Sequence, residues 1–261
     1  MTQVLLPSSD FLPEPIDPSL QVSPQPTLSP ASYTVQLRGV TKIYPKTKFG
    51  LVDVNLRLKQ GSFLFVTGPS GAGKTTLMKL IYGAERPDHG EVLVAGNSVG
   101  VLRGNRLSHL RRQLGVVFQD YKLIPRWTIT ENIAFVLKSQ GVPRDEIERR
   151  LRPTLKLVGL QKRADCFPDQ LSGGEQQRAS IARAIVGSPK LLLADEPTGN
   201  LDQENALQVL SILTKLNNLG ITVIITTHDM HLIQVAQAPV ARIYNGRLHM
   251  VNAEQAASER V

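Results

Sequence analysis

The stretch Gly68-Pro69-Ser70-Gly71-Ala72-Gly73-Lys74-Thr75 decides the fold, because it fits the phosphate-binding loop pattern G-x-x-x-x-G-K-[ST]. An apolar run at residues 62–67 precedes it and a helix-like stretch at residues 74–81 follows it, which is the context that this loop requires. Glycines let backbone N–H groups close around phosphate oxygens, and the helix directs its positive end at the same anion. The loop therefore predicts a nucleotide site in which Lys74 contacts the β- and γ-phosphates and Thr75 offers its hydroxyl to Mg²⁺. We include the next residue, Thr76, among the expected nucleotide contacts.

Two adjacent carboxylates, Asp195 and Glu196, follow a second apolar run, Leu191-Leu192-Leu193-Ala194. A buried strand here would carry Asp195 to the edge of a sheet, where its carboxylate can complete a Mg²⁺ shell. Because neighbouring residues of a strand point to opposite faces, we expect the two acids to have separate roles. Glu196 is then the candidate to orient and deprotonate a water molecule.

A third candidate element is the stretch Leu171-Ser172-Gly173-Gly174-Glu175-Gln176-Gln177-Arg178. Ser172 and Glu175 have the S-x-x-E spacing of a helix capping box. The two glycines leave backbone N–H groups bare at the start of the helix, which also suits an anion. On these residues alone, a plain helix cap explains the stretch better than an anion site does.

Short apolar runs alternate with segments of helical period from about Tyr33 onward, a pattern typical of an α/β fold with a largely parallel sheet. Asn245-Gly246, between two strand-like runs, predicts a two-residue hairpin. No internal repeat is visible. Strands are expected at 34–38, 51–58, 62–67, 91–95, 114–118, 190–194, 221–226 and 241–244, and helices at 74–81, 130–138, 144–157, around 181–186 and between the strands at 190–194 and 221–226.

The composition of the 261 residues excludes several classes of protein. The one cysteine, Cys166, excludes a disulfide scaffold and a cysteine-rich metal site. No apolar run approaches the roughly 18 residues that a membrane-spanning helix needs. The N-terminus also lacks the basic and apolar segments of a secretory signal.

Charge and proline are distributed unevenly along the chain. Residues 1–31 hold seven of the 17 prolines, three acidic residues and no Lys or Arg, which predicts a disordered or extended tail. That tail is either a docking arm for a partner or a dispensable extension. The remainder carries 30 basic and 19 acidic residues, a net charge of +11. Such a basic body favours an anionic partner, which could be a nucleotide, a nucleic acid or a membrane surface.

Taken together, these elements resemble the nucleotide-binding subunit of ABC (ATP-binding cassette) ATPases. The stretch LSGGEQQR resembles the signature sequence of that family, and further matches follow in the family's order from residue 32 to residue 251. These matches are Gln119 in Val117-Phe118-Gln119-Asp120 for the Q-loop, Asp202 in Asn200-Leu201-Asp202 for the D-loop, His228 in Thr226-Thr227-His228-Asp229 for the switch histidine, and Tyr44 for the aromatic residue that stacks on adenine.

The resemblance implies the fold and the domain limits. It implies an α/β protein with a P-loop ABC ATPase core, in which a mostly parallel sheet is joined by an antiparallel β subdomain and a helical subdomain. The ATP-binding domain is expected at residues 32–251, with its helical subdomain at about 119–188. The Pro-rich tail at 1–31 precedes it and a C-terminal tail at 252–261 follows it.

The resemblance also implies an ATPase that forms a homodimer when it binds ATP. In this family two subunits clamp two ATP molecules head to tail. Lys74 and Thr75 of one copy would therefore face Ser172, Gly173 and Gly174 of the other copy across one nucleotide. In this arrangement the γ-phosphate of ATP would be the anion that binds at the glycine-rich start of the helix.

Further roles follow from the same resemblance, with ATP and Mg²⁺ as the implied ligands. Glu196 would act as the general base, beside Lys74 as a second catalytic group. His228 would hold the γ-phosphate and Glu196 in register. Gln119 would contact Mg²⁺ or the attacking water, with Thr75 and Asp195 as the other metal ligands. Asp202 and Tyr44 would contribute to the nucleotide site.

Within the family, residues 109–120, 171–178 and 194–202 resemble the FtsE group of cell-division ATPases. This resemblance implies an integral membrane partner of the FtsX type and a role in cell division through the control of cell-wall hydrolases. It also implies a peripheral position on the cytoplasmic face of the inner membrane at the division site.

Two other functions stay open on the sequence. The ATPases of lipoprotein-releasing and macrolide-type exporters share the run DEPTGNLD at residues 195–202. Soluble ABC proteins that act with nucleic acid usually carry two cassettes or long insertions, and this sequence shows neither, so we expect no nucleic-acid partner. A non-hydrolysing scaffold is disfavoured because Lys74, Asp195, Glu196 and His228 are all present.

Overall fold

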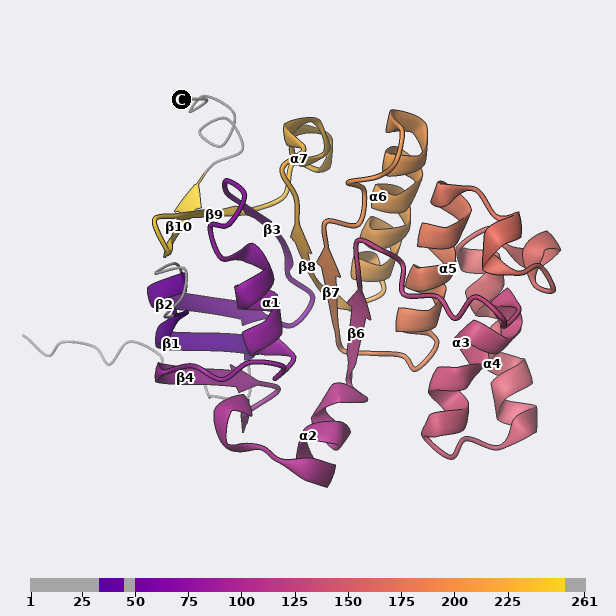
Figure 1. The fold of residues 1–261 in the computed structure, drawn as a ribbon, viewed down its shortest axis with the longest axis horizontal. Coiled ribbons are helices and arrows are strands. Elements are labelled where there is room, and N and C mark those ends of the chain that lie inside the picture. Colours follow the sequence, from indigo (N-terminus) through magenta and orange to yellow (C-terminus); the bar gives the residue numbers. More distant parts are fainter. Residues whose placement is uncertain (1–32, 45–49, 252–261) are drawn as a thin grey trace, which may run out of the picture.

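The computed structural model describes residues 33–44 and 50–251, and its centre is a six-stranded sheet in the order β10-β9-β3-β8-β7-β6 (Figure 1). Adjacent strands from β9 to β6 are parallel, and only β10 is antiparallel to its neighbour. The parallel strands read as continuous apolar runs because both faces of the sheet are covered. The strands are β3 (Phe63–Thr67), β6 (Leu114–Val117), β7 (Leu191–Asp195), β8 (Thr222–Thr226), β9 (Val240–Tyr244) and β10 (Arg247–Val251).

A second, antiparallel sheet in the order β2-β1-β4-β5 packs beside the first. The hairpin between β9 and β10 joins the two sheets, because the N–H of Val52 donates to the carbonyl of Gly246 at 2.8 Å. This sheet contains β1 (Tyr33–Ile43), β2 (Gly50–Lys59), β4 (His89–Val94) and β5 (Asn97–Ser98).

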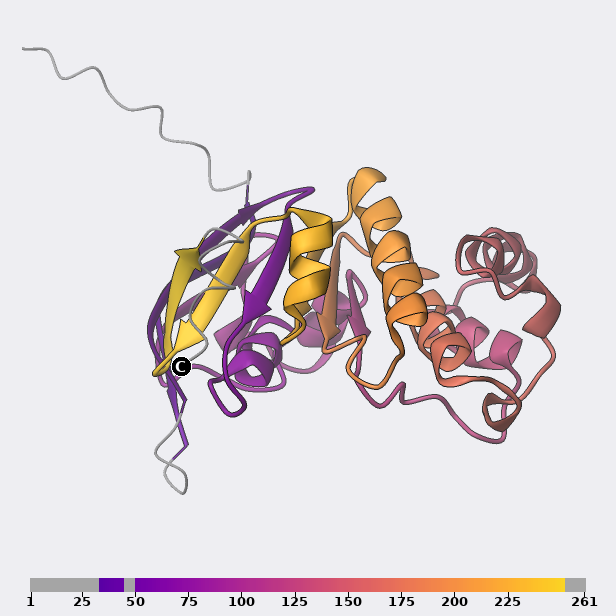
Figure 2. The same ribbon diagram turned by 90° about the horizontal axis from the view of Figure 1, so that it is seen from above.

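The helices are spread along the molecule, with α6 and α7 between α1 at one end and α3, α4 and α5 at the other (Figures 1 and 2). α1 lies beside the antiparallel sheet, whereas α3, α4 and α5 pack on one another at the opposite end. The helices are α1 (Lys74–Ile81), α2 (Gly104–Arg111), α3 (Ile129–Ser139), α4 (Arg144–Leu157), α5 (Gly173–Ile185), α6 (Gln203–Asn218) and α7 (Met230–Ala236).

The hydrophobic core consists of two clusters, one on each face of the parallel sheet. Successive residues of a strand alternate between them, as the two-residue period of a strand requires. Leu191 and Leu193 of β7 face the cluster that includes α1 and the antiparallel sheet. Leu192 and Ala194 face the cluster that includes α3, α4, α5 and α6. The central strands therefore contribute side chains to both clusters and connect the helices on one face of the parallel sheet to α1 and the antiparallel sheet on the other.

The predicted fold class is confirmed, and α1 and α4 occupy the residues expected for them. The hairpin at Asn245-Gly246 is also present, with Tyr244 opposite Arg247. The sequence did not predict α2 or α7. In α2 only Leu110 is buried, so the helix has no apolar face that a periodic pattern would reveal. α7 has seven residues, too few to establish a period.

Some expectations lie outside the described residues, namely the tails at 1–31 and 252–261. The limits of the helical subdomain, about 119–188, stay a prediction, and α3, α4 and α5 lie within them. Across residues 33–44 and 50–251, no helix combines the length and the apolar character needed to cross a bilayer.

A buried asparagine fixes the segment that leads into α3. Asn132 is fully buried, and its Oδ1 accepts a hydrogen bond from the N–H of Ile124 at 2.7 Å. Its Nδ2 donates to the carbonyls of Ile124 and Trp127 at 3.1 and 3.0 Å. One amide side chain therefore satisfies several backbone groups that burial would otherwise leave unpaired.

We expect Asn132→Ala to lower the free energy of unfolding by about 2–4 kcal/mol, because each unpaired buried polar group costs roughly 1–3 kcal/mol. Chemical denaturation monitored by circular dichroism measures this change. Asn218→Ala, at the exposed end of α6, is the matched control and should change the free energy by less than about 0.5 kcal/mol. Equal losses in the two variants would contradict the role given to Asn132.

Candidate functional site

The phosphate loop joins β3 to α1, and all three of its glycines have backbone angles that other residues rarely adopt. Gly68 has φ 149°, and a Cβ atom there would lie 2.3 Å from the carbonyl oxygen of Ile243. Gly73 has φ 112° and forms the N-cap of α1, where a Cβ would lie 2.7 Å from a methyl carbon of Leu51. Only glycine fits both positions, so the loop presents backbone rather than side chains at the start of the helix.

Lys74 is held at this loop although its side chain is only 9% exposed. Its Nζ donates to the carbonyls of Gly68 at 3.0 Å and Pro69 at 3.3 Å. The same Nζ lies 3.5 Å from Oε1 of Glu196. A largely buried ammonium group needs such partners, and here they place it between the loop and the end of β7.

Glu196 links Lys74 to His228. Its second carboxylate oxygen, Oε2, lies 3.4 Å from Nδ1 of His228, whose side chain is 67% exposed. The sequence predicts a catalytic role for these three residues, and the structure brings them together around one carboxylate.

The reason given for separating Asp195 from Glu196 was wrong. Strand β7 ends at Asp195, and Glu196 has a left-handed backbone with φ 45°. Its N–H donates to the carbonyl and to the hydroxyl of Thr226, at 3.1 and 2.9 Å. A turn held by Thr226, rather than strand alternation, therefore sets the direction of the Glu196 side chain.

Asp195 is positioned by the same threonine. The hydroxyl of Thr226 donates to Oδ1 of Asp195 at 2.6 Å, and Oδ2 has no hydrogen bond within the described residues. Burial and the nearby Asp195 carboxylate raise the pKa of Tyr82 above its usual value. Asp195 thus keeps one carboxylate oxygen for a cation.

Gln119 approaches Glu196 across a glycine. A Cβ atom on Gly199 would lie 3.3 Å from Nε2 of Gln119 and 3.7 Å from Oε2 of Glu196. Gly199 was not among the predicted site residues, although it lies in the run Asp195–Asp202 that carries the family resemblance. A larger residue there would be forced against both polar side chains.

The oxygen groups at this edge fit Mg²⁺ rather than an ion that needs an all-protein cage. In the part of the chain that the structure describes, no group of three or more His, Cys, Asp and Glu side chains could hold a metal ion. Mg²⁺ uses one or two carboxylates and takes its other ligands from water and substrate phosphates. Asp195, the exposed Thr75 and the exposed Gln119 supply ligands of this kind, and Thr76 is half-buried beside them.

The capping box predicted at the start of α5 is present. The N–H of Ser172 donates to Glu175 at 2.9 Å, and the N–H of Glu175 donates to the hydroxyl of Ser172 at 3.3 Å. Nε of Arg163 lies 2.9 Å from the other oxygen of Glu175. The hydrogen bond from the Ser172 backbone, followed by the contact with Arg163, holds the pKa of Glu175 below its usual value. The carboxylate is therefore committed to the cap.

Gly174, in the first turn of α5, and Asp202, the N-cap of α6, both lie close to Asn205. A Cβ on Gly174 would lie 2.0 Å from Oδ1 of Asn205, so only glycine fits there. Asp202 caps α6, because its two oxygens accept from the N–H and the side-chain amide of Asn205, each at 2.8 Å. The Asn205 backbone N–H, and then its side chain, lower the pKa of Asp202. Asn205 therefore connects the starts of α5 and α6.

Within one chain the predicted site residues form two separate groups. Lys74, Asp195, Glu196 and His228 lie at the end of the parallel strands, whereas Ser172, Gly173 and Gly174 begin α5. Both views show α1 and α5 on opposite sides of β6, β7 and β8 (Figures 1 and 2). Tyr44 lies on a third element, after β1, with Nζ of Lys42 5.6 Å from its ring centre.

Arg183 is a connecting residue that the sequence did not predict. Its guanidinium donates to the carbonyls of Tyr121, at 2.7 Å, and Lys122, both of which have left-handed backbones. Burial lowers the pKa of Arg183. A Cβ on Gly173 would lie 3.2 Å from the hydroxyl oxygen of Tyr121. Arg183 thus fastens the loop that follows Gln119 to α5, and Tyr121 leaves little room for a side chain at position 173. The one sequence signal of Arg183 is an arginine inside the apolar run Ile181–Ile185.

Comparison with known proteins identifies the class of protein. The family model described as ABC transporter matches residues 51–199. The solved structures that resemble this fold include the ATP-binding cassette MJ0796, dimeric and bound to ADP and Pi, with a TM-score of 0.75, 34% identity, and coverage of 84% of this chain and 98% of that one. CbiO1 from Clostridium perfringens, part of the ABC transporter complex cbiONQ, has a TM-score of 0.79 at 28% identity and covers 88% of this chain and 92% of that one. The chain belongs to the ABC transporter family, and it is an ATPase of the ABC type.

Particular relatives share a narrower description. The cell division ATP-binding protein FtsE of Bacillus subtilis is 42% identical over 81% of this chain and 93% of that protein. The FtsE proteins of Mycobacterium tuberculosis and Escherichia coli are 43% and 42% identical, each over 82% of this chain and over 94% and 97% of their own lengths.

We expect Arg183→Lys to reduce ATP turnover about tenfold to a hundredfold while ATP affinity stays within about threefold. A lysine cannot donate to two carbonyls in the fixed geometry of a guanidinium, and small displacements at a reaction centre cost rates of this size. Steady-state hydrolysis and nucleotide titration measure the two quantities. The control is Arg150→Lys, whose partner is Glu146 on the same helix, away from the site. Unchanged turnover in Arg183→Lys would contradict the role of Arg183 in positioning the loop that follows Gln119.

Proposed function

We propose that this chain is the ATP-hydrolysing subunit of a membrane complex of the FtsE type, acting with an FtsX-type integral membrane protein in cell division and in the control of cell-wall hydrolases. The observation that carries the proposal is the identity of 42–43% to proteins named FtsE over more than four-fifths of this chain and nearly the whole of those proteins. The proposal places the protein at the cytoplasmic face of the cell membrane, as a peripheral subunit at the division site.

ATP would bind at the phosphate loop, with the backbone N–H groups of residues 68–74 around the phosphates. Lys74 would leave its carbonyl partners, or share them, to contact the β- and γ-phosphates. Mg²⁺, when bound, would supply positive charge that offsets the charge of the phosphates. Thr75, Asp195 and Gln119 would be its protein ligands, and Tyr44 would stack on the adenine.

Glu196 would act as the general base. Its carboxylate lies between Lys74 and His228, at 3.5 and 3.4 Å, so its position is fixed from both sides. A positioned base contributes roughly 10²- to 10⁴-fold to a rate. His228, which is largely exposed, would contact the γ-phosphate and keep Glu196 aligned with the attacking water.

The complete site would require a second copy of the chain. Ser172, Gly173 and Gly174 begin α5, and α5 lies on the other side of β6, β7 and β8 from α1, the helix that follows the phosphate loop (Figures 1 and 2). Placed against a partner's loop, their hydroxyl and backbone N–H groups would bind the γ-phosphate. Asp202, at the adjoining start of α6, would lie in the same interface. The dimeric structures of the MJ0796 cassette support this arrangement.

We expect Glu196→Gln to lower ATP turnover by about 10²- to 10⁴-fold and to stabilise an ATP-dependent dimer, because the amide keeps the size of the side chain but cannot accept the proton. Sedimentation velocity with and without ATP and Mg²⁺ measures the dimer, and phosphate release measures turnover.

The double variant Lys74→Ala/Glu196→Gln is the control for this experiment. It lacks the ammonium contact with phosphate, so it should stay monomeric at the ATP concentration that dimerises Glu196→Gln. Wild-type turnover in Glu196→Gln, or a dimer that forms equally without ATP, would contradict the assignment.

The membrane partner can be identified by affinity capture of the tagged full chain from detergent-solubilised membranes. We expect recovery of a four-span protein of the FtsX type, at a higher yield from Glu196→Gln than from Lys74→Ala cells. Recovery of an exporter permease would overturn the cell-division role and keep the ATPase assignment. Recovery of nucleic acid or soluble factors alone would overturn the membrane role as well.

A further inference from the structure

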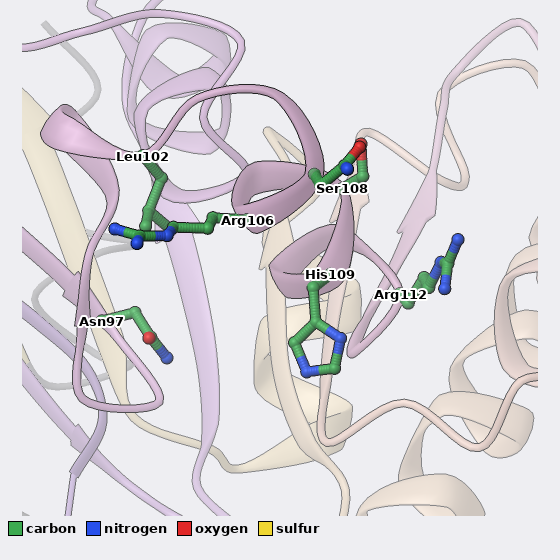
Figure 3. A pocket seen from close by; sticks show the side chains of 7 residues that line it. Asn97, Leu102, Arg106, Ser108, His109 and Arg112 are labelled. Carbon is green, nitrogen blue, oxygen red and sulfur yellow. The ribbon is translucent and has the colours of Figure 1, made fainter.

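A recess outside the nucleotide site lies between the β4–β5 hairpin and α2 (Figure 3). Its volume is about 630 Å³, and its lining includes Asn97, Leu102, Arg106, His109 and Arg112. In Figure 3 the guanidinium of Arg106 lies beside Leu102 on the same side as Asn97, His109 extends from the next turn of α2, and Arg112, the C-cap of α2, lies at the opposite end from Arg106. None of these residues belongs to the nucleotide site. We call this recess the α2 groove.

The α2 groove lies in the most one-sidedly charged part of the chain. Residues 92–119 contain four arginines and one histidine, and no Asp or Glu. Arg103 donates to the carbonyl of Leu102 at 2.6 Å, and Arg111 donates to the carbonyl of Gly83 at 2.9 Å, so both have structural partners.

The other two arginines, Arg106 and Arg112, line the α2 groove. Among the described residues no carboxylate lies within 4.0 Å of either guanidinium. Unpaired arginines that line a recess favour an anionic occupant, because a guanidinium binds carboxylate through two parallel hydrogen bonds.

The N-terminal residues join the fold beside this groove. The carbonyl of Thr34 accepts a hydrogen bond from the N–H of Ala95 at 2.9 Å, and Val35 is opposite Val94 in the sheet. Asn97, two residues beyond Ala95, lines the groove. The point from which residues 1–32 extend is therefore next to the groove in space.

Those first 32 residues have the complementary charge. They contain Asp10, Glu14 and Asp17, and no Lys or Arg. All three acids lie in one stretch, Asp10-Phe11-Leu12-Pro13-Glu14-Pro15-Ile16-Asp17, which also carries apolar side chains. From Asp17 to Thr34 there are 17 residues, which would span about 50 Å if extended at about 3.1 Å each.

We propose that this acidic stretch, residues 10–17, binds in the α2 groove of its own chain, with its carboxylates on Arg106 and Arg112 and an apolar side chain against Leu102. A tether of this length gives an effective concentration of about millimolar, so contacts that are weak one by one suffice to hold it. The groove is then an intramolecular docking site that keeps the basic surface of α2 covered, independently of ATP turnover and of any membrane partner.

Cysteine cross-linking in the full chain tests the proposal. In a Cys166→Ser background, Leu12→Cys is paired with Asn105→Cys, which lies in the groove lining. The control pairs Leu12→Cys with Lys59→Cys, an exposed residue directly opposite Tyr33 at the start of β1 and so within reach of the same tether. We expect the intramolecular disulfide to form about tenfold faster with Asn105→Cys, and the difference to shrink in 1 M salt.

Variants that change the charge of the α2 groove or of residues 10–17 test whether charge complementarity, rather than random collision, sets the cross-linking rate. Arg106→Glu/Arg112→Glu, and separately Asp10→Asn/Glu14→Gln/Asp17→Asn, should reduce cross-linking at Asn105→Cys to the rate at Lys59→Cys. Lys138→Glu/Arg152→Glu, an equal charge change at exposed positions on α3 and α4, should leave it unaltered. The triple variant changes no residue of the described fold, so a failure of the arginine variants to fold would leave the test intact.

Equal rates at the two cysteine positions, or a preference that survives both charge variants, would overturn the proposal. So would disulfides that form only between chains, which dilution and mass analysis distinguish. If Arg106→Glu/Arg112→Glu instead abolishes binding to phosphatidylglycerol vesicles and leaves cross-linking unchanged, the groove serves a lipid surface and the proposed occupant is wrong.

Discussion

The parallel hydrogen bonding of β3, β8 and β7 is the constraint on which the site depends. Val66 of β3 and Asp195 of β7 are both opposite Thr226 of β8, so the three strands end at one level. The phosphate loop, the acidic turn and the segment leading to His228 all emerge there. Lys74 and Glu196 are 122 residues apart in the chain, yet they meet at 3.5 Å because the strands before them end side by side.

Thr226, the last residue of β8, positions both acidic residues of the site. Its hydroxyl donates to Asp195 and accepts from the N–H of Glu196, and its carbonyl accepts from the same N–H. The left-handed turn at Glu196 is therefore supported from the neighbouring strand. Such a backbone conformation is costly for a residue other than glycine and persists where its surroundings hold it, as at functional sites.

Two side chains hold the segment between the two groups of site residues. Asn132 fixes residues 124–128 through hydrogen bonds to their backbone, and Arg183 fixes residues 121–122 against α5. Gln119, immediately before this segment, has its amide nitrogen 3.3 Å from where a Cβ of Gly199 would lie, so it is next to the acidic turn. The hydrogen bonds of Asn132 and Arg183 therefore hold in place the segment that follows Gln119.

The sequence by itself determined the phosphate loop, the acidic strand end, the capping box at Ser172 and the alternating α/β pattern, because each depends on residues that are adjacent or a few positions apart. Only the tertiary structure decided which of them meet. The turn at Glu196 depends on a threonine 30 residues further along the chain, and Arg183 reaches carbonyls about 60 residues away. Contacts of this kind follow from strand register and helix packing, which leave no local pattern. The same reason explains why α2 escaped prediction, since one buried leucine in eight residues gives no periodic signal.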